Sequence, residues 1–166
     1  MNRILMAALL MALISCAGVA QERSDEKKSS GYVFAAPGAV VTSGAAAGVL
    51  HFGAGGQGVL YKGLGMGAEI GYLSPNGSLA EGIGLASVNG LYEFKQANTK
   101  RKVIPFVTAG YSLAFRSGVF SAFNFGGGIN YWVRQKLALR LEARDYVSPS
   151  EPNAHLLTGR IGISFR

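Results

Sequence analysis

The C-terminal segment, residues 155–166, reads H-L-L-T-G-R-I-G-I-S-F-R, and its side chains alternate in character. One face of an extended strand would carry the apolar residues Leu157, Ile161, Ile163 and Phe165. The other face would carry Thr158, Arg160, Gly162 and Ser164. A strand buried in a soluble core would not hold an arginine at such a position, whereas a membrane-spanning barrel strand has one face toward lipid and one toward a polar interior. The segment therefore predicts a transmembrane β-strand.

The composition favours a β-barrel over a helical membrane protein. Hydrophobic residues make up 49% of the 166 residues, charged residues make up 15%, and the mean hydropathy is +0.24. Yet after residue 20 no apolar run approaches the roughly 18 residues that a transmembrane helix needs. The 24 glycines recur inside the apolar segments, where each would weaken a helix by about 1 kcal/mol. We expect one domain, either a barrel or a soluble domain with a large core.

The first 20 residues are typical of a secretory signal peptide. Arg3 supplies the positive charge, residues 4–14 the apolar stretch, and Gly18-Val19-Ala20 a small-residue cleavage site. The apolar stretch is too short for a membrane anchor. A secreted chain makes a nucleic-acid partner an unfavourable explanation of the net charge of +7.

A second interpretation of the N-terminus stays open. Leu13-Ile14-Ser15-Cys16 fits a lipobox, in which Cys16 would become a lipidated N-terminus. Cleavage after Ala20 is the favoured alternative, and it would leave the mature chain without cysteine and hence without a disulfide. Residues 21–30 are all polar and predict a disordered linker, so the folded domain is expected at residues 31–166.

Strand-like segments follow one another from residue 31 to the C-terminus. Their side chains alternate with period two, as in residues 137–147, where Leu139 and Leu141 oppose Arg140 and Glu142. We expect eight strands, at residues 32–41, 46–61, 64–73, 82–94, 103–116, 122–133, 137–147 and 156–165. An even number returns the C-terminus to the side of the N-terminus, as bacterial barrels require.

The larger aliphatic faces of these segments oppose glycines, charges and amides. A soluble barrel would place apolar residues inside, and an eight-stranded barrel is only wide enough for side chains to fill. Small and polar residues inside with apolar residues outside fit a membrane. The sequence therefore predicts an all-β fold, an eight-stranded antiparallel up-and-down transmembrane β-barrel, with both termini in the periplasm.

Three pieces of the chain carry a resemblance to a known family. They are G-L-G-M-G-A-E-I-G-Y-L, P-F-V-T-A-G-Y-S and F-N-F-G-G-G-I-N-Y-W. With them, residues 31–166 resemble the small OmpA/OmpX-type outer-membrane β-barrel domain. The resemblance implies a monomer in the outer membrane of a Gram-negative cell, in contact with outer-membrane lipids and lipopolysaccharide. It also implies a C-terminal signal for the barrel-assembly machinery at Ile161, Ile163 and Phe165, although the family form ends on the aromatic and this chain adds Arg166.

Several charged residues are predicted to point into the barrel. They are Glu69, Glu93, Arg116, Arg140, Glu142, Arg144 and Arg160. Isolated buried charges cost several kcal/mol, so these groups need partners. The favoured interpretation is a salt-bridge plug that holds the lumen shut. A small gated pore with an arginine-rich, anion-favouring lining and an acid–base couple of Glu69 with Glu142 are the alternatives.

The remaining polar residues give no strong catalytic pattern. His51 and His155 are the two histidines, and an enzyme acting on lipid A would need a serine and a carboxylate beside one of them. A rim position for His155 is favoured, no metal-ligand spacing is present, and no cofactor is expected. The aromatic residues near strand ends predict interface girdles; they are Tyr32, Tyr61, Tyr72, Tyr92, Phe94, Tyr111, Phe115, Phe123, Tyr131 and Trp132. We expect a non-catalytic envelope protein with a structural or surface-interaction role, with a narrow pore or a lipid A enzyme as alternatives.

Overall fold

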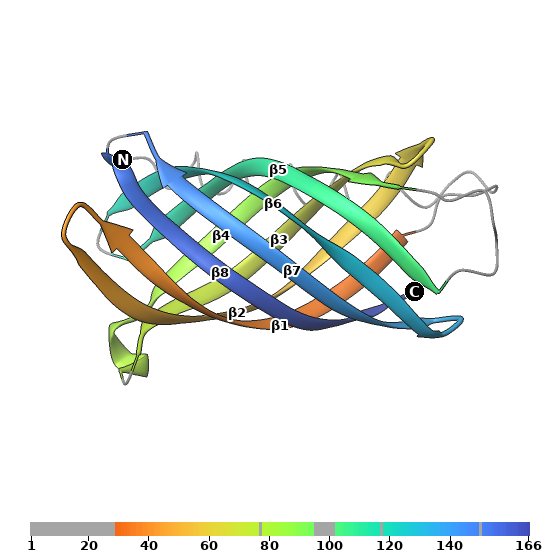
Figure 1. Cartoon of the computed structure of the whole chain (residues 1–166), viewed down its shortest axis with the longest axis horizontal. Helices are drawn as coiled ribbons and strands as arrows, with labels where there is room; N and C mark the ends of the chain where they lie inside the picture. The colour runs from red at the N-terminus through yellow and green to blue at the C-terminus, as the bar shows by residue number, and fades with distance from the viewer. Residues whose placement is uncertain (1–28, 77, 95–101, 117, 150) are drawn as a thin grey trace, which may run out of the picture.

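The computed structural model shows one closed barrel of eight tilted strands (Figure 1). It describes residues 29–76, 78–94, 102–116, 118–149 and 151–166. The predicted signal peptide, Cys16 and residues 21–28 of the predicted linker lie outside these ranges. The described residues contain no helix long and apolar enough to cross a membrane.

Every strand is antiparallel to both of its neighbours, and the strands follow one another around the barrel in chain order. The strands are β1 (Ser29–Thr42), β2 (Ala45–Tyr61), β3 (Leu64–Pro75), β4 (Ile83–Glu93), β5 (Val103–Phe115), β6 (Val119–Arg134), β7 (Leu137–Ser148) and β8 (Glu151–Phe165). A short 3₁₀ helix, η2 (Leu79–Glu81), lies between β3 and β4. The predicted eight-stranded up-and-down barrel is confirmed.

Three strands begin three or more residues earlier than the sequence pattern predicts. Ser29 and Ser30, assigned to the linker, belong to β1 and pair with Gly58 and Gln57 of β2. Strand β8 begins at Glu151 rather than near residue 156. The residues added to β1 and β8 are mostly polar, so the apolar alternation used for the prediction fades before the hydrogen-bonded ladder ends. Strand β6 begins at Val119 rather than residue 122 and gains the apolar Val119 and Phe120.

The turn between β2 and β3 is a tight two-residue hairpin. Lys62 and Gly63 have φ angles of 45° and 94°, which a primed turn requires and which matches the twist of the flanking strands. Because the strands alternate in direction, this turn and the β6–β7 turn lie at the same end of the barrel. The C-terminus lies there too, since the backbone oxygen of Lys136 in the β6–β7 turn accepts a hydrogen bond from the Arg166 N–H at 3.1 Å. We call this end the terminal end and the opposite one the loop end.

The outer surface of the barrel is apolar around its girth. Leu64, Ile70 and Ile161 are 60%, 61% and 59% exposed, respectively. Most of the buried residues other than glycine are polar or charged, and serine, asparagine, glutamate and arginine are the commonest of these. This distribution is the reverse of a soluble protein's, and it leaves the apolar side chains in a favourable environment only when they face lipid. The structure is therefore that of a membrane-embedded barrel.

Strands β1 and β8 close the barrel along a seam that is interrupted in the middle. The ladder runs from the Gly31–Phe165 pair to Ala35–Ile161, and resumes at Gly38–Thr158 in the same register. The skipped positions include Pro37, which has no N–H to donate. Opposite it, Gly159 offers no side chain, and a shallow external groove is lined by both residues.

Candidate functional site

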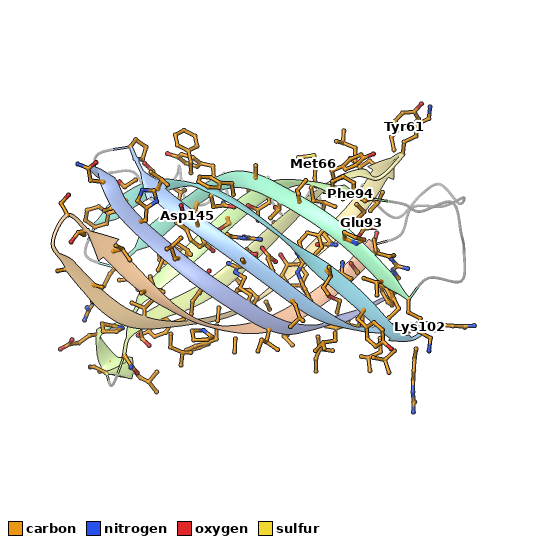
Figure 2. All side chains as sticks on the ribbon, in the orientation of Figure 1. Tyr61, Met66, Glu93, Phe94, Lys102 and Asp145 are labelled. Carbon is orange, nitrogen blue, oxygen red and sulfur yellow. The ribbon has the colours of Figure 1, made fainter. Side chains whose placement is uncertain are left out.

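The interior of the barrel holds a cluster of acidic and basic side chains, of which Figure 2 labels Glu93. Six of the seven residues predicted to point inward are buried, each no more than 6% exposed. They are Glu69, Glu93, Arg140, Glu142, Arg144 and Arg160. The strand period explains their shared direction, because residues two apart on β7 project to the same face.

Glu69 of β3 is the centre of this cluster. Its Oε1 accepts hydrogen bonds from Arg144 Nη1 and Arg160 Nη2, both at 2.9 Å. Its Oε2 accepts from Tyr32 Oη at 2.9 Å and from Arg160 Nη1 at 3.0 Å. One carboxylate of β3 thus links its own strand to β1, β7 and β8. Charge-assisted bonds of this kind are the stronger ones in proteins.

Glu142 forms the second centre, between two arginines of its own strand. Arg140 Nε donates to its Oε2 at 3.0 Å, and Arg144 Nε donates to its Oε1 at 2.6 Å. Arg140 Nη1 also donates to Gln57 Oε1 at 2.9 Å, and Gln57 Nε2 donates to Glu93 Oε1 at 3.3 Å. The network therefore runs from β7 across the lumen to β2 and β4.

Aromatic rings pack against the guanidinium groups of two arginines in the cluster. The guanidinium of Arg140 lies 4.0 Å from the centroid of the Phe106 ring and 4.6 Å from that of Tyr32. Arg160 lies 4.2 Å from the Phe34 ring centroid and donates to the hydroxyl of Tyr146. Ring faces attract cations, and the attraction strengthens when water is excluded. The cluster is thus both paired in charge and packed.

The lumen between this cluster and the loop end is lined by small, uncharged polar groups. Ser87 and Ser112 share a hydrogen bond at 2.8 Å, and Asn124 Nδ2 donates to Ser112 Oγ at 2.9 Å. His51 is 1% exposed, and its ring meets Phe34 edge-on with centroids 5.0 Å apart. Neither ring nitrogen of His51 has a hydrogen-bond partner among the described residues.

Arg116 does not join the cluster. Strand β5 ends at Phe115, so the alternation used to place Arg116 no longer applies to it. Its side chain is exposed at the loop end and donates to the backbone oxygens of Glu81 at 2.8 Å and Ala80 at 3.4 Å. Arg116 therefore anchors the β3–β4 loop instead of pairing with a carboxylate inside the barrel.

Two aromatic residues expected in the girdles lie elsewhere. Tyr32 is 3% exposed and bonds to Glu69. Trp132 is half-buried, with the Arg166 guanidinium 3.8 Å from its ring centroid. Both faces of β1 are apolar near Tyr32, so the sequence pattern could not tell whether this side chain points inward or outward. Trp132 lies two residues after the inward-facing Asn130, and this spacing could have predicted that the two side chains share a face.

Sequence reasoning also missed two interior residues, Gln57 and His51. Both lie on the glycine-rich β2, where the contrast between the faces is weak. Their even spacing along this strand is the signal that could have joined them on one inward face.

On the outer face of β7 and β8, a carboxylate contacts an imidazole ring. His155 Nδ1 lies 2.8 Å from Asp145 Oδ2, near the loop end. His155 is thus a surface residue of the rim, as predicted. No group of three or more His, Cys, Asp or Glu side chains that could hold a metal ion occurs within the described ranges.

The predicted C-terminal signal residues lie on the outer face of β8. Ile161, Ile163 and Phe165 are 59%, 49% and 50% exposed. Ile163 pairs with Val33 of β1 and Phe165 pairs with Gly31. The same residues therefore form the part of the closing seam nearest the terminal end.

No family model matches the chain, and no curated protein sequence matches it. Solved structures match its fold. Neisserial surface protein A is 13% identical, with a TM-score of 0.68 over 85% of this chain and 99% of that chain. Ail, the attachment invasion locus protein of Yersinia pestis, is 12% identical, with a TM-score of 0.64 over 85% and 99%.

The N-terminal β-barrel domain of Pseudomonas aeruginosa OprF is 13% identical, with a TM-score of 0.62 over 84% of this chain and 98% of that chain. Identities this low establish the fold alone. The chain has the fold of the small OmpA/OmpX-type outer-membrane β-barrels, and the predicted resemblance is confirmed at that level.

Proposed function

We propose that this chain is a non-catalytic protein of the Gram-negative outer membrane that stabilises the envelope or presents its short loops at the surface. The observation that supports this function most directly is the charge cluster across the lumen. Its arginines are held by Glu69 and Glu142 from opposite walls, so an ion in transit would have to displace several charge-assisted bonds.

The apolar exterior and the neighbours' fold support the outer membrane as the location. In this proposal the terminal end faces the periplasm, the barrel-assembly machinery inserts the chain through the segment that ends in Phe165, and the mature protein is a monomer. Lipopolysaccharide and phospholipid contact the apolar girth. The loops at residues 42–45, 75–83, 115–119 and 148–151 are the parts available to an outside partner.

Two measurements test the proposal. The folded protein in detergent should migrate on a gel differently before and after boiling, which is expected of an intact barrel. Planar bilayers containing that folded species should show no discrete conductance steps. Steps that disappear in a Glu69→Ala variant or change their ion selectivity would replace the closed barrel by the narrow pore.

The pairing of Asp145 with His155 is the observation that keeps an enzyme as the second candidate. A carboxylate that orients a histidine is part of the machinery of serine hydrolysis, and the reaction also needs a serine within reach of the other ring nitrogen. Incubation of the folded protein with lipid A should release no fatty acid. Release by the wild type that is lost in His155→Ala would support the enzyme instead.

A further inference from the structure

Cationic side chains ring the terminal end of the barrel; those of Lys62, Lys102, Arg134 and Lys136 are exposed, and that of Arg166 is half-buried. Each hairpin turn at this end with described residues carries them, and so does the residue that follows β8. We call Lys62, Lys102, Arg134, Lys136 and Arg166 the terminal basic ring. Lys62 lies between β2 and β3, Lys102 precedes β5, Arg134 and Lys136 flank the β6–β7 turn, and Arg166 ends the chain. Figure 2 shows Lys102 at this end, with Tyr61 and Phe94.

Among the described residues, acidic side chains do not neutralise the terminal basic ring. Within the described ranges, Glu93 is the acidic residue at this end, and its buried side chain is hydrogen-bonded to Gln57. The sequence between β4 and β5 adds Lys95, Lys100 and Arg101 and no acidic residue. In residues 21–28, before β1, three acidic residues are balanced by three basic ones. Both segments lie outside the described residues.

The loop end has a different charge balance. Its described charged side chains include Arg116 and Glu81, which are exposed at neighbouring loops, and Asp145, which is paired with His155. The positive charge of the surface is therefore concentrated at one end of the barrel. A basic protein whose excess charge served only solubility would not need this asymmetry.

The ring lies beside a belt of exposed aromatic side chains. Tyr61, Tyr92, Phe94, Tyr131 and Phe165 are 40–65% exposed at the same strand ends. Lys62 Nζ lies 5.1 Å from the Tyr61 ring centroid. Aromatic rings of this kind sit at the headgroup level of a bilayer. The cations are therefore held at the depth of the lipid phosphates, around the whole circumference and not in one pocket.

We propose that the terminal basic ring binds the phosphate groups of anionic phospholipids in the leaflet that surrounds this end of the barrel. The inference rests on the proposed membrane insertion and goes beyond it, because it assigns a lipid class and a leaflet. Lysine and arginine near an anionic membrane surface attract its headgroups, and salt screens the attraction. A circumferential ring suits headgroups that surround the barrel better than a single soluble anion.

Spin-label electron paramagnetic resonance tests this binding. The full-length mature protein is folded into phosphatidylcholine vesicles with a trace of spin-labelled phosphatidylglycerol or spin-labelled phosphatidylcholine. The motionally restricted fraction reports the lipid at the protein surface. We expect the anionic lipid to be preferred by about twofold or more at low salt, and the preference to fall at high salt. Equal restricted fractions for both lipids in the wild type would overturn the proposal.

Matched variants assign the effect to the ring. Lys62→Gln, Lys102→Gln, Arg134→Gln and Lys136→Gln combined should reduce the preference, while Lys62→Arg, Lys102→Arg and Lys136→Arg combined should keep it. Arg116→Gln removes one cation from the loop end and should leave it unchanged. A preference that survives the four-glutamine variant would refute this assignment and point to another anion-binding surface.

Heat-dependent gel migration of every sample separates this inference from the proposed function. Each variant alters exposed positions, so each should still show the migration of a folded barrel. A folded wild type without lipid preference counts against the ring alone. A wild type that shows no folded species in phosphatidylcholine counts against the membrane barrel itself, and with it against the ring.

Discussion

Replacing Glu69 by alanine tests whether the interior cluster stabilises the barrel. The carboxylate accepts four hydrogen bonds, from Tyr32, from Arg144 and twice from Arg160. Arg144 would keep Glu142, which it contacts at 2.6 Å. Arg160 would keep Tyr146, but its distance to Glu142 is 4.0 Å. The main cost is thus one buried guanidinium without a close counter-charge, and such a loss destabilises proteins by about 3–5 kcal/mol.

The free energy of unfolding is measured with urea on protein folded into phosphatidylcholine vesicles. The fluorescence of Trp132, the one tryptophan of the chain, reports unfolding, and gel migration provides a second probe. Glu81→Ala is the matched control, because it removes an exposed carboxylate from η2. An exposed substitution of this kind should change stability by less than about 0.5 kcal/mol.

A double-mutant cycle decides whether the loss comes from the ion pair. Arg160→Met replaces the cation by an apolar side chain, and the variant with both changes no longer holds an unpaired charge. We expect a coupling of roughly 0.5–3 kcal/mol between positions 69 and 160. A Glu69→Ala cost as small as that of Glu81→Ala, or a coupling of zero, would refute the account of the cluster given above.

Three further outcomes follow from the fold. Leu139→Arg, on the lipid face of β7, should destabilise the barrel by roughly 2–4 kcal/mol if it lies near the midplane, while Asn76→Arg in an exposed loop should be nearly neutral in the same urea titration. Deletion of residues 163–166 removes three of the nine residue pairs of the seam, so the truncated chain should be absent from the outer-membrane fraction; a normal yield there would contradict closure through β8. Gly128→Ala should cost about 1–3 kcal/mol, because the added methyl group would press on the Leu141 carbonyl oxygen, whereas Gly159→Ala meets no atom within 4 Å and should be tolerated; equal costs would contradict the packing at Gly128.

The strand pattern could be predicted from the sequence wherever the two faces differ strongly. On β7, the leucines at 137, 139 and 141 alternate with charged or small residues, and all of the alternating positions lie on the expected face. Period two alone sets this outcome, because successive side chains of a strand point to opposite faces. Boundaries were harder, since polar residues such as Ser29 and Ser30 continue the ladder without an apolar signal.

The partners inside the barrel could not be predicted in the same way. Alternation tells which residues of one strand point inward, but the stagger between distant strands decides which of them meet. Glu69 therefore could be placed in the lumen, whereas its contact with Tyr32 and Arg160 depends on the barrel's tilt and registers. The prediction that Arg116 points into the barrel was wrong for a local reason. The strand ends one residue before it, and its side chain bonds to backbone oxygens of η2.

The interrupted seam between β1 and β8 has a consequence for motion. Backbone hydrogen bonds protect amides from exchange with solvent, and protection is lost first where the ladder is weakest. At Pro37 no donor exists, and Gly159 across from it contributes no side chain to cover the gap. Local opening of this wall should therefore begin at mid-height and not at either rim. Hydrogen–deuterium exchange should then divide β8 into two slowly exchanging halves, 161–165 and 155–158, on either side of a faster centre.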